Sequence, residues 1–163
     1  MAGGWSKAIN GLSGHLLVEF EDLDPGLRHA VYIELRNGSL NPFAVTNQPQ
    51  IQSALFDSAG KPVRTSGLWV SGPLPSPQWA QIPRDAYIGF RIDMQTVGMP
   101  TREYGAALMA VGSMSWMLPA GEYVLKATVV FTAEKDGPEN QWVGELELPP
   151  CTFSVTQEML AVH

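Results

Sequence analysis

The stretch that most clearly predicts the fold is residues 118–131, which reads LPAGEYVLKATVVF. The turn formers Pro119 and Gly121 come first, and from Tyr123 onward apolar residues occupy every second position as far as Phe131. Strict alternation is typical of a half-buried strand, because successive side chains of a strand point to opposite faces of the sheet. The stretch therefore predicts a tight turn that leads into a long central strand.

The same alternation recurs along the chain, and Gly, Pro, Asn and Asp separate one run from the next. The alternating runs are residues 15–21, 29–36, 50–57, 86–94, 122–132, 142–148 and 151–156. Residues 115–118 also read as a short strand, whereas residues 106–111 fit either a strand or one helical turn. Together these runs predict an all-β, immunoglobulin-like antiparallel β-sandwich of about seven to nine strands with one long loop.

Length and composition fit a single domain that extends over residues 1–163. The core is expected at about residues 14–157, with looser ends at 1–13 and 158–163. Sixteen glycines and thirteen prolines leave little room for long helices. The net charge of −6 argues against a nucleic-acid partner, because such proteins neutralise phosphates with basic side chains.

Two resemblances rest on turns. Residues 118–123 resemble the start of the penultimate strand in bacterial immunoglobulin-like and fibronectin-like modules, where a tyrosine such as Tyr123 forms a tyrosine corner with nearby backbone. The order of three segments, 35–42, 55–63 and 118–123, is similar to a small bacterial sandwich family that includes an intracellular proteinase inhibitor. That likeness covers roughly residues 31–131 and implies a loop presented to a protease. No inhibitory loop residue is matched, and none is carried over.

The longest irregular segment is residues 65–83, which holds four prolines together with Trp69 and Trp79. Proline cannot donate to a β-ladder, so the segment is expected to be a loop or an edge crossing. Two interpretations of the tryptophans stay open. The rings either stack on a sugar or a partner side chain, which makes Trp69 and Trp79 candidate ligand-binding residues, or they form a small satellite core. Trp116, Trp142 and the methionines of the middle third are expected in the main core.

No nucleophile with a partnered base stands out. The histidines are His15 and His29, which both lie near expected strand starts on the surface, and His163 at the end of the chain. Cys151 alternates with apolar residues and is expected to be a buried, unreactive thiol. The sequence thus predicts no enzyme and no catalytic residue.

Carboxylates form two groups. Glu19, Glu21, Asp22 and Asp24 are compatible with calcium ligands, but a solvated strand edge explains them more simply. Glu145 and Glu147 share a strand face at a spacing that glycoside hydrolysis also uses, although outward positions on an exposed strand give the same pattern. No metal and no cofactor is therefore expected.

A lone cysteine excludes an intrachain disulfide, and no run of 18 apolar residues is present. Residues 1–12 lack the apolar core expected of a signal peptide. The chain is expected in the cytoplasm if it is complete, or outside it if it is a mature segment. The function that fits best is a non-catalytic binding or accessory module, of bacterial type, that contacts a protein or a carbohydrate. The alternative is a proteinase inhibitor-like protein.

Overall fold

The computed structural model describes residues 4–23, 26–68, 76–92 and 105–161. These residues form eleven strands and one short helix. The elements are β1 (Leu12–Leu23), β2 (Gly26–Asn37), β3 (Phe43–Thr46), β4 (Gln50–Asp57), β5 (Gly67–Leu68), β6 (Trp79–Ile82), β7 (Tyr87–Arg91), β8 (Ala107–Val111), β9 (Met114–Leu118), β10 (Gly121–Phe131), β11 (Gly144–Val155) and α1 (Gln157–Leu160). The strand number exceeds the expected seven to nine because short strands form where the sequence does not alternate.

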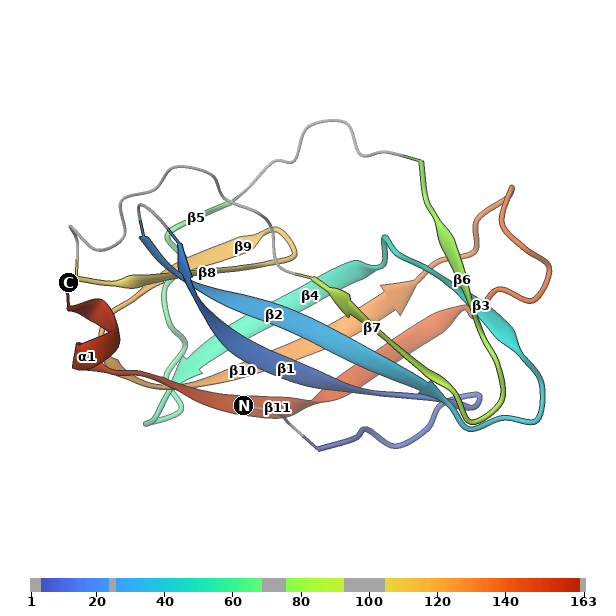
Figure 1. Ribbon diagram of the computed structural model, residues 1–163, viewed down its shortest axis with the longest axis horizontal. Coiled ribbons are helices and arrows are strands. Elements are labelled where there is room, and N and C mark those ends of the chain that lie inside the picture. The colour runs from blue at the N-terminus through green and yellow to red at the C-terminus, as the bar shows by residue number, and fades with distance from the viewer. Residues whose placement is uncertain (1–3, 24–25, 69–75, 93–104, 162–163) are drawn as a thin grey trace.

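The strands build the predicted all-β sandwich (Figure 1). One sheet has the order β1-β2-β8-β9-β5, with β7 also paired to β2, and the other has the order β11-β10-β4. A small third sheet joins β3 to β6. The sandwich is not purely antiparallel: among the described strands, β2 and β8 run parallel where Arg28 pairs with Leu108.

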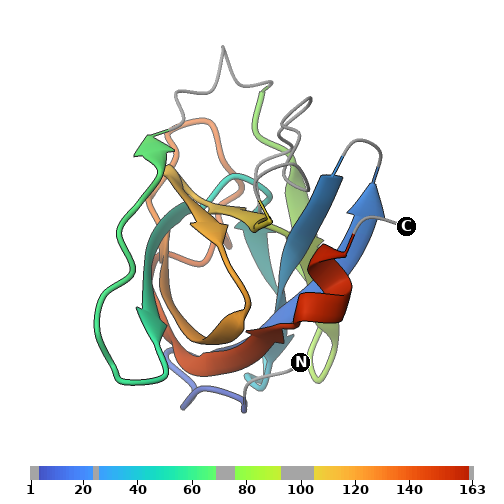
Figure 2. The same ribbon diagram turned by 90° about the vertical axis from the view of Figure 1, so that its left-hand side faces the viewer.

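The core lies between the sheets, and the strands surround it in the end-on view of Figure 2. The inward residues of β10 are all buried, as the alternation predicts. At the seam between the sheets β1 lies close to β11, since a Cβ on Gly14 would stand 2.9 Å from a methyl carbon of Leu148. The glycine therefore permits the close approach of the two edge strands.

Several predictions about individual side chains are confirmed. The Tyr123 hydroxyl donates a hydrogen bond of 2.8 Å to the Pro119 carbonyl, which is the predicted tyrosine corner. Trp116, Trp142 and Cys151 are buried in the core. The hairpin of β8 and β9 also decides between the two interpretations of residues 106–111 in favour of a strand.

Residues 65–83 differ from the expected loop. Their described parts contain β5 and β6, and both strands lie at sheet edges. β6 ends at Ile82, directly before Pro83, which has no N–H to continue the ladder. The expectation of an edge position is met, whereas the expectation of an irregular segment is wrong for these two strands.

His29 also differs from its expected surface position. It lies within β2 and is 2% exposed. Its ring packs between Phe20, at 6.2 Å between centroids, and Phe153, at 5.0 Å. The expectation was wrong because the alternation places residue 29 on the face that β2 turns toward the core at the level of Phe153.

Candidate functional site

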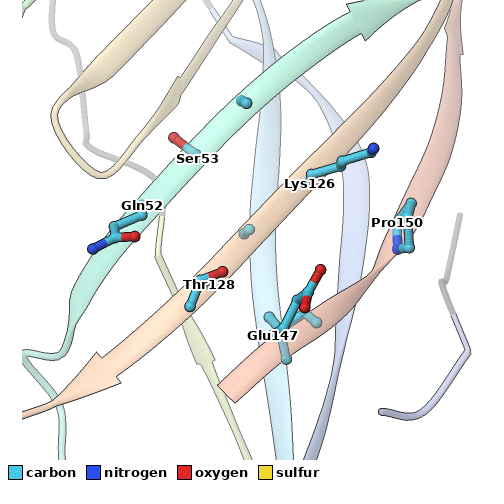
Figure 3. Close-up of a pocket in the computed structure, with 9 residues that line it drawn as sticks. Gln52, Ser53, Lys126, Thr128, Glu147 and Pro150 are labelled. Carbon is cyan, nitrogen blue, oxygen red and sulfur yellow. The ribbon is translucent and has the colours of Figure 1, made fainter. Parts of the chain in front are cut away.

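The outer face of the second sheet carries a row of polar side chains. Thr128 on β10 pairs with Gln52 on β4 and with Glu147 on β11. Residues paired across neighbouring strands project from the same face of a sheet, so these three side chains form one line across the three strands. Lys126 is the next outward residue of β10, and its partner on β4 is the exposed Ala54. Figure 3 shows the labelled side chains on the three strands.

A register irregularity hollows this face. Leu125 pairs with Cys151 and Ala127 pairs with Leu148, so Lys126 faces two residues of β11, Pro149 and Pro150. Two residues opposite one define a β-bulge, which bends the strand. Neither proline has an N–H to donate, which suits them to a position where the ladder is interrupted.

The result is a shallow, open hollow with a volume of about 250 Å³. Gln52, Lys126, Thr128, Glu147 and Pro150 contribute to its lining (Figure 3). Ala54 also lines the hollow, and its small side chain leaves the space above it unfilled.

The residues before β1 extend the hollow on the other side of β11. The Ser6 amide donates to the Gly14 carbonyl at 2.8 Å, and the Gly14 amide donates to the Ser6 hydroxyl at 3.0 Å. These bonds hold Trp5, 44% exposed, with its ring stacked on His15 at 4.3 Å between centroids.

Trp5, Lys7 and Ile9 line a second hollow of about 320 Å³ with Pro149 and Pro150. The two hollows share lining residues of β11, including Glu147 and Pro150, and so form one surface. We call this surface the sheet groove and define it by six residues: Trp5, Gln52, Lys126, Thr128, Glu147 and Pro150.

The polar side chains of the sheet groove do not bond to one another. Within the described parts of the chain, the side chains of Gln52, Lys126, Thr128 and Glu147 form no hydrogen bond or ion pair. The Lys126 ammonium lies over the Phe56 ring, 4.9 Å from its centroid, which positions the cation without using its three N–H donors. Their capacity for hydrogen bonds is thus open to solvent or to a ligand.

The outer face of the first sheet is built differently. Glu21 on β1 accepts a bond of 2.9 Å from Arg28 and two bonds, of 3.1 Å and 2.9 Å, from Arg91. The hydrogen bonds from Arg28 and then Arg91 hold the pKa of the Glu21 carboxyl below its ordinary value. His15 and Glu34 form a further pair at 3.0 Å. We call this face the paired face and define it by these five residues, which use one another as partners.

The predicted aromatic site is only partly described. Trp69 lies outside the described residues. Trp79 begins β6, is half-buried, and pairs with Thr46 on β3. Its ring lies close to the turn at Gly137, where an added Cβ would stand 2.7 Å from the indole. This packing accords with the satellite-core interpretation of Trp79, while its role in ligand binding stays a prediction.

The carboxylate groups have separate environments. Glu21 belongs to the arginine cluster, and Asp24 lies outside the described residues. Among the residues that the structure describes, no three His, Cys, Asp or Glu side chains gather in a way that suits a metal ion. Glu147 belongs to the sheet groove, and Glu145 is exposed one pair further along β11.

Sequence reasoning did not single out Trp5, Gln52, Lys126 or Thr128. Each looks like an ordinary polar or terminal residue when it is considered alone. The available signal was the Pro149-Pro150 pair inside an alternating run, because prolines in a strand mark a bulge or an edge.

Comparison with models of known protein families finds no match, and no curated protein matches the chain. No helix formed by the described residues has the length and apolar character needed to cross a membrane.

Proposed function

We propose that this protein is a non-catalytic binding module that contacts a protein or a carbohydrate through the sheet groove. The observation that carries the proposal is the row of Gln52, Thr128 and Glu147, with Lys126 beside it, whose side chains bond to no described residue. Ordered polar groups that have no internal partner are available to fix the orientation of a ligand.

The shape of the groove supports binding in preference to chemistry. Catalytic sites gain much of their effect by excluding water around preorganised charges. The sheet groove is shallow and open, and its floor is the outer face of a sheet. Such a surface suits recognition by contact along an extended molecule.

A variant that fills the groove tests this proposal. Ala54→Arg places a long side chain over the hollow from an exposed position of β4. Tyr87→Arg is the matched control, because Tyr87 is 70% exposed on β7 in the other sheet. Wild type and both variants would be screened on a glycan array and against a phage-displayed peptide library.

We expect specific binding by the wild type and the control, and loss of that binding in Ala54→Arg. Binding that survives in Ala54→Arg and is lost in Tyr87→Arg would overturn the proposal. The same three proteins would be tested as inhibitors of trypsin and subtilisin. Inhibition that Ala54→Arg leaves intact would instead favour the proteinase inhibitor-like alternative.

A further inference from the structure

We infer that the ligand of the sheet groove is an uncharged oligosaccharide, which lies across β4, β10 and β11 and ends against Trp5. This inference rests on the proposed function and names the class of ligand. Three features of the groove carry it: its mixture of donors and acceptors, its apolar surfaces and its charge balance.

The polar row offers both kinds of hydrogen-bonding group. The Gln52 amide and the Thr128 hydroxyl each donate and accept, Glu147 accepts and Lys126 donates. A sugar hydroxyl also donates and accepts, so alternating partners of this kind suit a row of hydroxyls. The row crosses two strand spacings, roughly 10 Å, which is the scale of a short oligosaccharide and not of a single monosaccharide.

Apolar surface lies beside the polar row. Trp5, from the segment before β1, and Pro150, on β11, line the same hollow. Flat aromatic and proline surfaces pack against the C–H faces of sugar rings and lose little conformational freedom when they do so. Trp5 is held in advance by its stacking on His15 and by the bonds between Ser6 and Gly14, which lowers the entropic cost of binding further.

The charges of the six residues that define the groove cancel, because Lys126 carries one positive charge and Glu147 one negative charge. Lys7, which also lines the second hollow, adds one positive charge. The whole chain carries −6, which disfavours strongly acidic ligands. A peptide in an extended conformation would be recognised chiefly through its main chain at a strand edge, whereas the groove presents side chains on a sheet face. An uncharged carbohydrate therefore fits better than an anion or a peptide.

Isothermal titration calorimetry with defined probes tests the inference. The probes are cellotetraose, xylotetraose, maltotetraose and mannotetraose, with tetragalacturonate as the acidic counterpart. The variants are Trp5→Ala, Gln52→Leu and Thr128→Val, and Tyr87→Ala on β7 is the control. Near-UV circular dichroism checks that each variant is folded, and Thr128→Val provides a nearly isosteric change if Trp5→Ala disturbs the N-terminal segment.

We expect at least one neutral tetrasaccharide to bind, and the acidic one to bind more weakly. Trp5→Ala should weaken the affinity roughly tenfold or more, with a smaller loss for the two polar variants and none for Tyr87→Ala. Failure of all neutral probes, or equal affinity in wild type and the three groove variants, would overturn the inference.

A peptide-display selection on the same proteins separates this failure from failure of the proposed function. If selected peptides bind the wild type and lose binding in the groove variants, the proposed binding function of the groove would stand and the inference of a carbohydrate ligand would be overturned. If no peptide and no sugar depends on the groove, both proposals are overturned.

Discussion

The two outer faces of the sandwich contain similar residue types, yet they use them in opposite ways. On the paired face, Glu21 forms ion pairs with Arg28 and Arg91, and Glu34 pairs with His15. In the sheet groove, Glu147 and Lys126 lie on adjacent strands but form no ion pair with each other. The difference indicates that strand register decides the role of a charged side chain. Where the register places an opposite charge beside it, the side chain forms an ion pair, and where it does not, the side chain stays available to a ligand.

The largest expected effect concerns His29, which lies beneath the paired face in the core. Burial lowers the pKa of its imidazole from 6.5 to about 4. Between these two values the unfolded chain binds a proton at His29 that the folded chain does not. The stability that the neutral imidazole contributes is therefore fully present above pH 6.5 and is lost as the pH falls toward 4. The pKa difference corresponds to about 3 kcal/mol of unfolding free energy.

Urea unfolding of wild type and His29→Phe at pH 7.0, 5.5 and 4.5 measures this contribution. The phenyl ring retains packing between Phe20 and Phe153 but does not titrate. The difference between the two proteins should change in favour of His29→Phe as the pH falls. A constant difference over this range would contradict the buried, neutral histidine.

The comparison between the faces is sharpened by one substitution made on each. Glu21→Gln removes the charge that two arginines share and should lower the free energy of unfolding by about 2 kcal/mol, the scale of hydrogen bonds to charged groups. Glu147→Gln removes a carboxylate that bonds to no described residue and should change stability by less than about 0.5 kcal/mol. Urea unfolding at pH 7 checks both, and equal losses would remove the distinction between the faces.

The buried face of the strands could be predicted from the sequence alone, whereas the sheet groove could not. The inward residues of β10 were predictable because burial of one strand face leaves a local, period-two pattern. The sheet groove was not, because it depends on which residues of β4 and β11 stand beside Thr128, and pairing between distant strands leaves no local pattern. His29 was misplaced for a different reason: it shares the inward parity of Val31 and Ile33, but a histidine at a strand start was assigned to the surface by residue type, whereas Phe153 covers it.

A smaller effect is expected at the tyrosine corner, which fixes the start of the strand at the centre of the groove. Tyr123→Phe removes the hydroxyl that donates to the Pro119 carbonyl but keeps the buried ring. The loss should be about 1 kcal/mol, the net value of one hydrogen bond. Thermal unfolding should show a decrease in Tm of roughly 2–4 °C. An unchanged Tm would mean that the corner does not stabilise β10.

The smallest stability effect is expected for Thr128→Val, at the centre of the polar row. The side chain keeps its shape and its high strand propensity, and the lost hydroxyl bonds to no described residue. Stability should remain within about 0.5 kcal/mol of wild type. A larger loss of unfolding free energy in urea would show that the Thr128 hydroxyl forms a stabilising hydrogen bond. Thr128 would then have a structural role instead of a role in ligand binding.

The most direct test of the central claim, that the sheet groove is the binding surface, is an NMR titration. Isotopically labelled protein would be titrated with the pooled neutral tetrasaccharides, and amide shifts would be followed residue by residue. We predict the largest amide shifts at residues 52–54, 126–128 and 147–148. Shifts concentrated at residues 28–36 and 87–91, or no shifts at any probe concentration, would contradict it.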